Sequence, residues 1–155
     1  MALKFFIEQL AFCPPDPKAA KELLTEMGAG DWANDHVIAA GDVRGHRGSN
    51  EADLAFEYEM LKGARELEVL HYTRGDNWMA AVGPCVSHIG MHCEEDTLAE
   101  WKKFFAARGV PIVQEVNTSS HSNPAIAGMR EYHYCIFGTR DILGVDTKFI
   151  CRKFI

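Results

Sequence analysis

The chain contains several short segments in which apolar and polar residues alternate. The segments ADLAFEYEM (52–60) and RELEVLHY (65–72) place apolar residues at alternate positions, which is typical of a strand with one buried face. Two further runs, FFIEQLAFC (5–13) and HVIAAGDV (36–43), are rich in aliphatic and aromatic residues and also predict strands. The first half of the chain is therefore expected to form mostly β-structure.

A helix is predicted directly after the first strand. Asp16 suits the N-cap and Pro17 the first helical position, and Gly28 ends the pattern. The apolar stripe of this helix consists of Ala20, Leu23, Leu24 and Met27. The expected order in this half is strand, helix, strand, strand, strand.

The second half repeats this order. The run CVSHIGMHC (85–93) predicts a strand, and TLAEWKKFFAARG (97–109) predicts a helix that begins with a Thr97/Glu100 capping box and ends at Gly109. Its apolar face, predicted to pack in the core or against a second copy, consists of Leu98, Trp101, Phe104 and Phe105. Three more strands are predicted at 111–116, 132–139 and 145–154. A Gly-rich surface hairpin or longer loop is predicted at 44–51, and a long polar loop at 117–130.

The two halves can be aligned on each other. The alignment places Gln9 opposite His88 and Glu68 opposite Lys148, with spacings that agree to within one residue. An internal repeat of about 80 residues, each copy too small to close a core alone, predicts that the copies pack around a shared interior. The chain is therefore expected to be a single domain, 1–155, built from modules 5–75 and 84–155.

Composition narrows the classes of function. The 155 residues are 47% hydrophobic, which suffices for one compact core, and the net charge of −6 comes without a run of Lys or Arg. A nucleic-acid partner is disfavoured because phosphate binding needs basic surface. No apolar run approaches the roughly 20 residues that span a bilayer, and the N-terminal run makes a poor signal peptide, so we expect a cytoplasmic protein with no membrane partner.

The cysteines are odd in number and scattered, with no CxxC pair. This spacing argues against a disulfide framework and against a cysteine zinc site, and predicts buried thiols in a reducing compartment. The five are Cys13, Cys85, Cys93, Cys135 and Cys151.

The openings of the two halves, IEQLAFCPPDP and SHIGMHCEED, carry a resemblance to a known family. Each opens with a Gln or His followed seven positions later by an acid: Gln9 by Asp16, and His88 by Glu95. In this respect the chain, over residues 5–152, resembles the vicinal oxygen chelate superfamily, which includes glyoxalase I, bleomycin-resistance proteins and extradiol dioxygenases. The resemblance implies an α+β fold of two βαβββ modules, forming incomplete barrels around a shared cavity, and a homodimer.

The superfamily takes its metal ligands from the first and last strands of each module. The matching positions here are Gln9, Glu68, His88 and Lys148. The first three suit Ni, Zn, Mn or Fe, but a protonated Lys has no lone pair and repels a cation. Either Lys148 replaces the metal and pairs with Glu68, so that no cofactor is bound, or a shift in the hairpin TRDILG brings Asp146 into the fourth place.

Two functions follow from these alternatives. With a metal, the resemblance implies a glyoxalase-type lyase or isomerase that stabilises an enediolate-type oxyanion, with Glu68 and Lys148 as catalytic candidates. Without one, it implies a small-molecule binding or sequestering protein of the resistance type. A domain that kept the fold and lost the site is a third interpretation. A dioxygenase is disfavoured because Gln9 stands where a His would.

Further residues are candidates for contact with the small-molecule ligand. On a strand, His88 and His92 share a face but lie roughly 13 Å apart, so one metal cannot take both and His88 is the ligand candidate. The candidates for substrate contact are His92, His133, Tyr72 and Asp146.

Overall fold

The computed structural model describes residues 3–43, 45–61, 65–75, 87–120 and 122–155. Among these, the first half contains a strand, a helix and three strands: β1 (Gln9–Phe12), α1 (Pro17–Glu26), β2 (Ala33–Val43), β3 (His46–Glu57) and β4 (Glu66–Gly75). The second half has the same order with a short helix added before its last strand. Its elements are β5 (His88–His92), α3 (Glu95–Ala106), β6 (Ile112–Ser120), β7 (Arg130–Phe137), α4 (Arg140–Leu143) and β8 (Asp146–Phe154).

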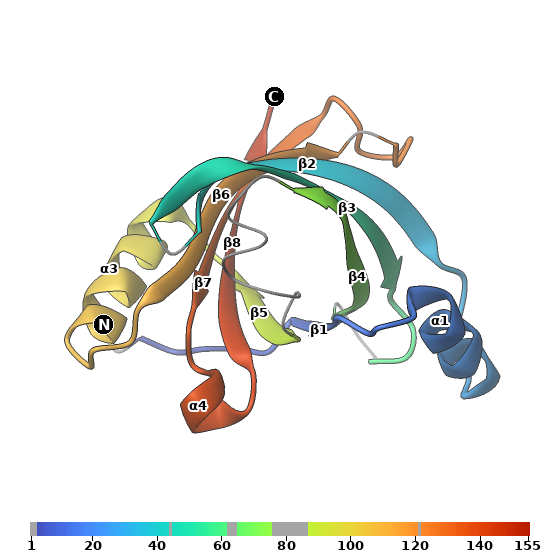
Figure 1. Ribbon diagram of the computed structural model, residues 1–155, viewed down its shortest axis with the longest axis horizontal. Helices are drawn as coiled ribbons and strands as arrows, with labels where there is room; N and C mark the ends of the chain where they lie inside the picture. Colours follow the sequence, from blue (N-terminus) through green and yellow to red (C-terminus); the bar gives the residue numbers. More distant parts are fainter. Residues whose placement is uncertain (1–2, 44, 62–64, 76–86, 121) are drawn as a thin grey trace.

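The described strands close into one eight-stranded barrel in the order β1-β4-β3-β2-β6-β7-β8-β5. Strand β1 is parallel to β4 and β5 is parallel to β8, whereas the other neighbours are antiparallel. Figure 1 shows α1 and α3 on the outside of the barrel, at opposite sides. The protein is therefore a sheet-rich α+β protein with few described helices, as the sequence predicted at this level of detail.

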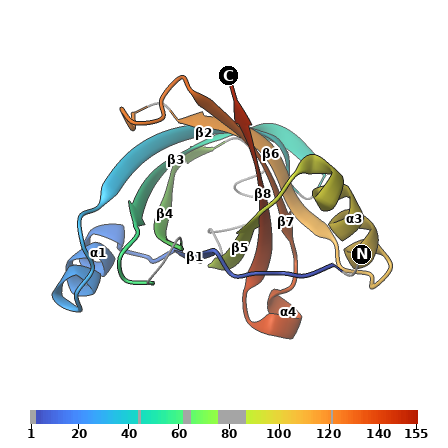
Figure 2. The ribbon, with the colours of Figure 1, turned by 180° about the vertical axis from the view of Figure 1, so that it is seen from behind.

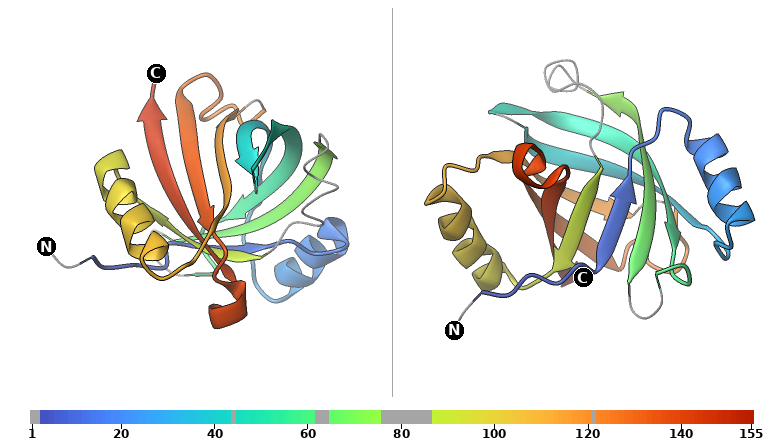
Figure 3. Two further views of the ribbon diagram at one scale, coloured as in Figure 1. Left: turned by 60° about the vertical axis from the view of Figure 1, so that its left-hand side comes forward. Right: turned by 90° about the horizontal axis from the view of Figure 1, so that it is seen from below.

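The two halves of the chain meet along two antiparallel seams. One joins β1 to β5, with Gln9 opposite Gly90, and the other joins β2 to β6, with Val37 opposite Ser120. The view from below in Figure 3 shows β1 and β5 side by side. Because β4 and β8 flank this pair, the first and last strands of both halves form one continuous wall, β4-β1-β5-β8.

Figure 2 shows α3 on the outside of the barrel. The larger of the two apolar clusters among the described residues joins this helix to strands β5, β7 and β8. Trp101 and Phe105 of α3 pack on Phe149 of β8 and Phe137 of β7, with Trp101 and Phe149 ring centroids 5.1 Å apart. The predicted apolar face of this helix is confirmed as core. Since side chains alternate along a strand, residues next to these on β5, β7 and β8 point into the barrel.

Helix α1, unlike α3, buries none of its residues against the barrel. The predicted N-cap is confirmed, because Asp16 accepts a hydrogen bond from the Ala19 N–H at 3.0 Å and Pro17 begins the helix. The helix has no buried residue, and Leu23 and Met27 of its apolar stripe are exposed. The stripe therefore does not mark a core helix here, in contrast to α3.

The predicted limits of several elements are wrong. Strands β2 and β3 pair as far as Val43 and His46, so of the two alternatives for 44–51 the hairpin is the one observed, with Gly45 in the turn at φ +80° and β3 beginning earlier than predicted. Strand β6 extends to Ser120, into the predicted loop 117–130. Polar residues continue these ladders because the hydrogen bonds come from the backbone, and the β2–β6 seam pairs both strands.

The ends of two further elements also differ from the prediction. Helix α3 begins at Glu95, after an N-cap Glu94 that makes no side-chain cap bond, so the Thr97/Glu100 capping box is wrong. Strand β1 begins only at Gln9, and Phe5 in the segment before it packs edge-on against Phe149. Acidic residues at the start of α3 suit the positive end of the helix dipole.

The cysteine prediction is partly corrected. Cys13 is disulfide-bonded, whereas Cys93, Cys135 and Cys151 are free thiols, as predicted. Cys85 lies outside the described residues. None of the helices in the described part of the chain is long and apolar enough to cross a membrane.

Candidate functional site inside the barrel

The four positions that the repeat singled out come together on one wall of the barrel. Gln9, Glu68, His88 and Lys148 lie on the neighbouring strands β1, β4, β5 and β8. They are polar or charged, yet only 2–5% of each is exposed. Lys148 faces the interior, since its sequence neighbour Phe149 packs on α3 outside, and the contacts that join the other three to it place them on the same side.

The side chains are in direct contact. His88 Nε2 lies 3.2 Å from Gln9 Oε1 and 3.3 Å from Glu68 Oε2. Lys148 Nζ lies 3.6 Å from the same Glu68 oxygen. One buried carboxylate therefore lies between an imidazole and an ammonium group.

Gln9 is held in place by a second carboxylate. Its Nε2 donates to Glu66 Oε1 at 2.6 Å, which leaves its Oε1 directed at His88. Burial raises the pKa of Glu66, and the Glu68 charge adds to this effect, against the opposing influence of Lys148 and Gln9. Gly90 lies opposite, where a Cβ would come within 3.1 Å of the Gln9 side chain, so the absence of a side chain permits this approach.

Glu68 is the electrostatic centre of the site. Burial by itself would raise its pKa, but the Lys148 charge and the hydrogen bond and charge of His88 outweigh burial and lower the pKa to about 2. Glu68 is thus a carboxylate at neutral pH. Its Oε2 lies within ion-pair distance of both His88 Nε2 and Lys148 Nζ.

The adjoining wall of β7 and β8 alternates cations with aromatic rings. Lys148 Nζ lies 4.3 Å from the centroid of the Tyr134 ring, and Tyr134 stacks on Tyr132 at 5.8 Å. Arg152 Cζ lies 5.9 Å from the Tyr132 ring centroid. Burial raises the pKa of Tyr134 well above its usual value, so its hydroxyl stays protonated.

The register of β8 places Lys148, and not Asp146, beside Glu68. Asp146 is buried beside α4, where its Oδ1 accepts the backbone N–H of Arg140 at 3.3 Å. The alternative in which Asp146 takes the fourth place through a shifted hairpin is therefore not the arrangement observed.

Three other predicted contact residues lie apart from the four. His92 is further along β5, with Nδ1 3.3 Å from Glu8 Oε2 and Nε2 3.3 Å from Arg152. The Tyr72 hydroxyl donates to Gln114 Oε1 at 3.3 Å. His133 points the opposite way, to the outside of the barrel, where Nδ1 lies 2.9 Å from Glu95 Oε1.

Sequence reasoning did not single out Glu66, Tyr134 or Arg152 as site residues. All three follow from alternation on strands that were correctly predicted. Glu66 shares a strand face with Glu68, and Tyr134 lies on the face opposite His133.

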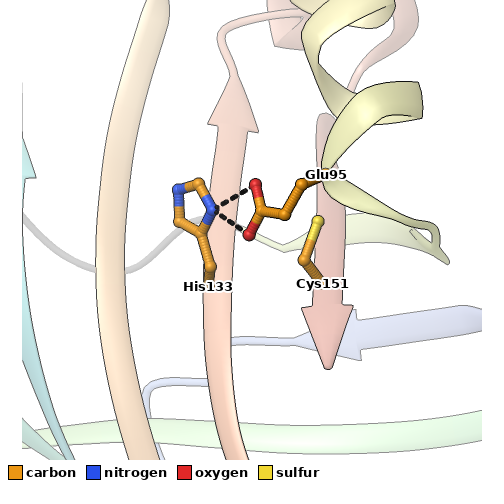
Figure 4. Close-up of side chains that lie close together, drawn as sticks. All are labelled: Glu95, His133 and Cys151. Atoms are coloured by element: carbon orange, nitrogen blue, oxygen red, sulfur yellow. Dashed lines mark hydrogen bonds and ion pairs between the residues drawn. The ribbon is translucent and has the colours of Figure 1, made fainter. Parts of the chain in front are cut away.

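A second group of polar side chains lies outside the barrel. Glu95 of α3, His133 of β7 and Cys151 of β8 each offer one ligand atom, and these atoms lie within 4.8 Å of one another (Figure 4). Carboxylate, imidazole and thiolate are all metal ligands. This group could hold a metal ion.

The four residues inside the barrel fit a metal ion less well than the group outside the barrel does. Three of the four could coordinate one, but the Lys148 ammonium lies within contact distance of the Glu68 oxygen that a metal would need.

No model of a known protein family matches the chain, and no curated protein is similar to it in sequence.

Proposed function

We propose that the protein is a metal-free member of the vicinal oxygen chelate superfamily that binds a small organic molecule inside the barrel. The observation that carries this proposal is the Lys148 ammonium, 3.6 Å from Glu68 at the position of the fourth ligand. An ammonium has three donors and no lone pair. Its charge replaces that of a cation and disfavours a second one.

The wall around Lys148 favours a small acid with an apolar or aromatic body. Lys148 and Arg152 supply two positive charges along one face of β8, with the rings of Tyr134 and Tyr132 beside them. A ligand carboxylate can accept hydrogen bonds from the Lys148 ammonium, which has donors beyond the one directed at Glu68. The tyrosine faces offer apolar contact area to the rest of the ligand.

The pKa of Glu68 favours binding over proton-transfer catalysis. A general base works best when its pKa lies near the operating pH, and the pKa of Glu68 is lowered to about 2. A carboxylate this acidic has little tendency to take a proton from a substrate. The expected catalytic role of Glu68 is therefore replaced in this proposal by charge balance for Lys148.

The first test is metal content. The test uses a Cys151→Ser variant, which lacks one ligand of the group outside the barrel (Glu95, His133 and Cys151, called the outer group). This protein is stripped of metal with a chelator and dialysed against Ni, Zn, Mn or Fe(II). We expect no bound metal at the interior set, and about one equivalent after Lys148→Glu, which supplies a fourth ligand. Lys148→Met is the matched control, because it removes the charge without adding a ligand.

One equivalent in the background protein itself, lost on Glu68→Gln, would overturn the proposal. That result would favour the metal-dependent lyase or isomerase. The measurement on the background protein decides this point even if Lys148→Glu fails to fold.

The second test is ligand binding. Thermal shifts are measured with a panel of small aromatic and aliphatic carboxylates, each paired with its neutral amide. We expect at least one carboxylate to raise the Tm of the wild type and not that of Lys148→Met, while its amide has little effect. Stabilisation by none of the acids, or equal stabilisation of Lys148→Met, would contradict the proposal and favour a domain without a ligand site.

A further inference from the structure

A fourth candidate ligand lies beside the outer group of Glu95, His133 and Cys151. Cys93, directly after β5, places its Sγ 4.0 Å from Cys151 Sγ, although it is not among the three residues whose ligand atoms all lie within 4.8 Å of one another, so its thiol would have to move toward Glu95 and His133 to share a metal with them. In a tetrahedral zinc site with Zn–S bonds of about 2.3 Å, two sulfurs lie about 3.8 Å apart. The observed separation is thus close to that of two thiolates on one metal, and both cysteines are free thiols.

His133 is oriented as a metal-binding histidine would be. Its Nε2 lies 2.9 Å from Glu115 Oε1, and its Nδ1 lies 2.9 and 3.0 Å from the two Glu95 oxygens. Metal-bound histidines usually donate their other ring N–H to a carboxylate, which fixes the tautomer. Here Glu115 takes that place, and Lys102 in turn is paired with Glu115.

Two carboxylates flank the His133 imidazole, one at each ring nitrogen. A neutral ring carries one N–H, so with Nε2–H directed at Glu115, the lone pair of Nδ1 would face the Glu95 carboxylate. A cation bound by both His133 Nδ1 and the Glu95 carboxylate would relieve this repulsion. The Cys151 thiol lies beside this contact between His133 and Glu95 (Figure 4).

From this geometry we propose that Cys93, Glu95, His133 and Cys151 form a structural site for a borderline-soft divalent cation, with Zn²⁺ as the expected metal. Four protein ligands of N, O and S type are what zinc takes in closed structural sites. Binding releases the two thiol protons to solvent as thiolates form. The metal would join the start of α3 to β7 and β8.

The site lacks the obstacle found inside the barrel. None of the four proposed ligand residues is a Lys or Arg, in contrast to Lys148 in the interior set. Lys102 is paired with Glu115, behind the histidine. The Glu95 side chain is 63% exposed and that of His133 is 20% exposed, so a hydrated ion can reach them from solvent.

The test is a Co²⁺ titration of the full chain, kept reduced and stripped of metal. We expect about one equivalent to give the thiolate-to-cobalt charge-transfer absorption in the near ultraviolet and the visible bands of tetrahedral Co²⁺, both abolished when Zn²⁺ displaces it. The charge-transfer absorption should be lost in a Cys93→Ser/Cys151→Ser variant. Glu115→Gln should weaken binding about 10- to 100-fold, as loss of the carboxylate behind a ligating histidine does.

Matched controls separate this site from the interior one. Cys135→Ser changes another free thiol outside the group and should keep the absorption, as should the double variant Glu68→Gln/Lys148→Met, which removes both charges of the interior pair. Absence of the charge-transfer absorption in the intact reduced chain, or its persistence in Cys93→Ser/Cys151→Ser, would overturn the proposal. Either result leaves the test of the interior ligand unaffected, since that site contains no described cysteine.

Discussion

The interior set and the outer set use similar residue types but place a positive charge differently. Inside the barrel the ammonium of Lys148 is itself a member of the set, 3.6 Å from Glu68. Outside, Lys102 is paired with Glu115, which lies behind His133, so the ligand atoms face one another without an ammonium among them. Under the two proposals, the position of one lysine decides which of the two clusters accepts a metal ion.

The two sets also differ in burial. Glu68 and His88 are each 2% exposed, and charges removed this far from water depend strongly on their partners. The outer histidine and its carboxylates keep contact with solvent, where ion pairs contribute little. Changes inside the barrel should consequently cost far more stability than equivalent changes outside it.

The largest expected effect comes from Glu68→Gln. It leaves the Lys148 ammonium buried without its carboxylate, and breaking a buried pair in this way costs about 3–5 kcal/mol of unfolding free energy. Guanidinium denaturation at neutral pH measures the loss. The double variant Glu68→Gln/Lys148→Met, which removes both charges, should recover most of it. A loss below about 1 kcal/mol for Glu68→Gln would mean that the pair is effectively solvated.

The next effect is a pH dependence carried by the same carboxylate. Its pKa falls from 4.5 to about 2 on folding, so its contribution is present above pH 4.5 and is lost as the pH drops toward 2. The loss amounts to about 3 kcal/mol. Glu66 acts in the opposite sense, because its pKa is raised and its contribution is lost as the pH rises through that raised value.

Denaturation curves between pH 2 and 7 check this prediction. Glu57 and Asp35 also have lowered pKa values and give the wild type and the variant a common slope. The difference between wild type and Glu68→Gln reports the Glu68 contribution together with the change that its charge causes in the pKa of Glu66. A difference that stays constant from pH 7 to 2 would contradict the lowered pKa.

Much of the interior set could be predicted from sequence because it depends on strand register. Period-two alternation placed Glu68 and Lys148 on strands, and the repeat aligned those strands, so their meeting with Gln9 and His88 required only that the first and last strands be neighbours. The loop limits were less predictable, because β2 and β6 continue through polar residues once they pair with each other.

The outer set was not predicted, for a physical reason. Its members come from the end of β5, the start of α3, and the outer faces of β7 and β8, and no local spacing connects Cys93 to His133 or Cys151. The scattered cysteines argued against a zinc site because such sites are recognised in sequence by short spacings. Only the packing of α3 on the barrel brings these side chains together.

The smallest expected effect is that of His133→Asn on the metal-free, reduced chain. The imidazole is partly exposed and bridges Glu95 and Glu115, while Glu115 keeps its partner Lys102. Partly exposed pairs of this kind contribute about 0–1 kcal/mol, and we expect a loss in that range by urea denaturation. With Zn²⁺ present the difference between wild type and variant should widen, because only the wild type would hold the ion tightly. A loss above about 2 kcal/mol without metal would instead identify the outer set as an ion-pair network that supports the packing of α3.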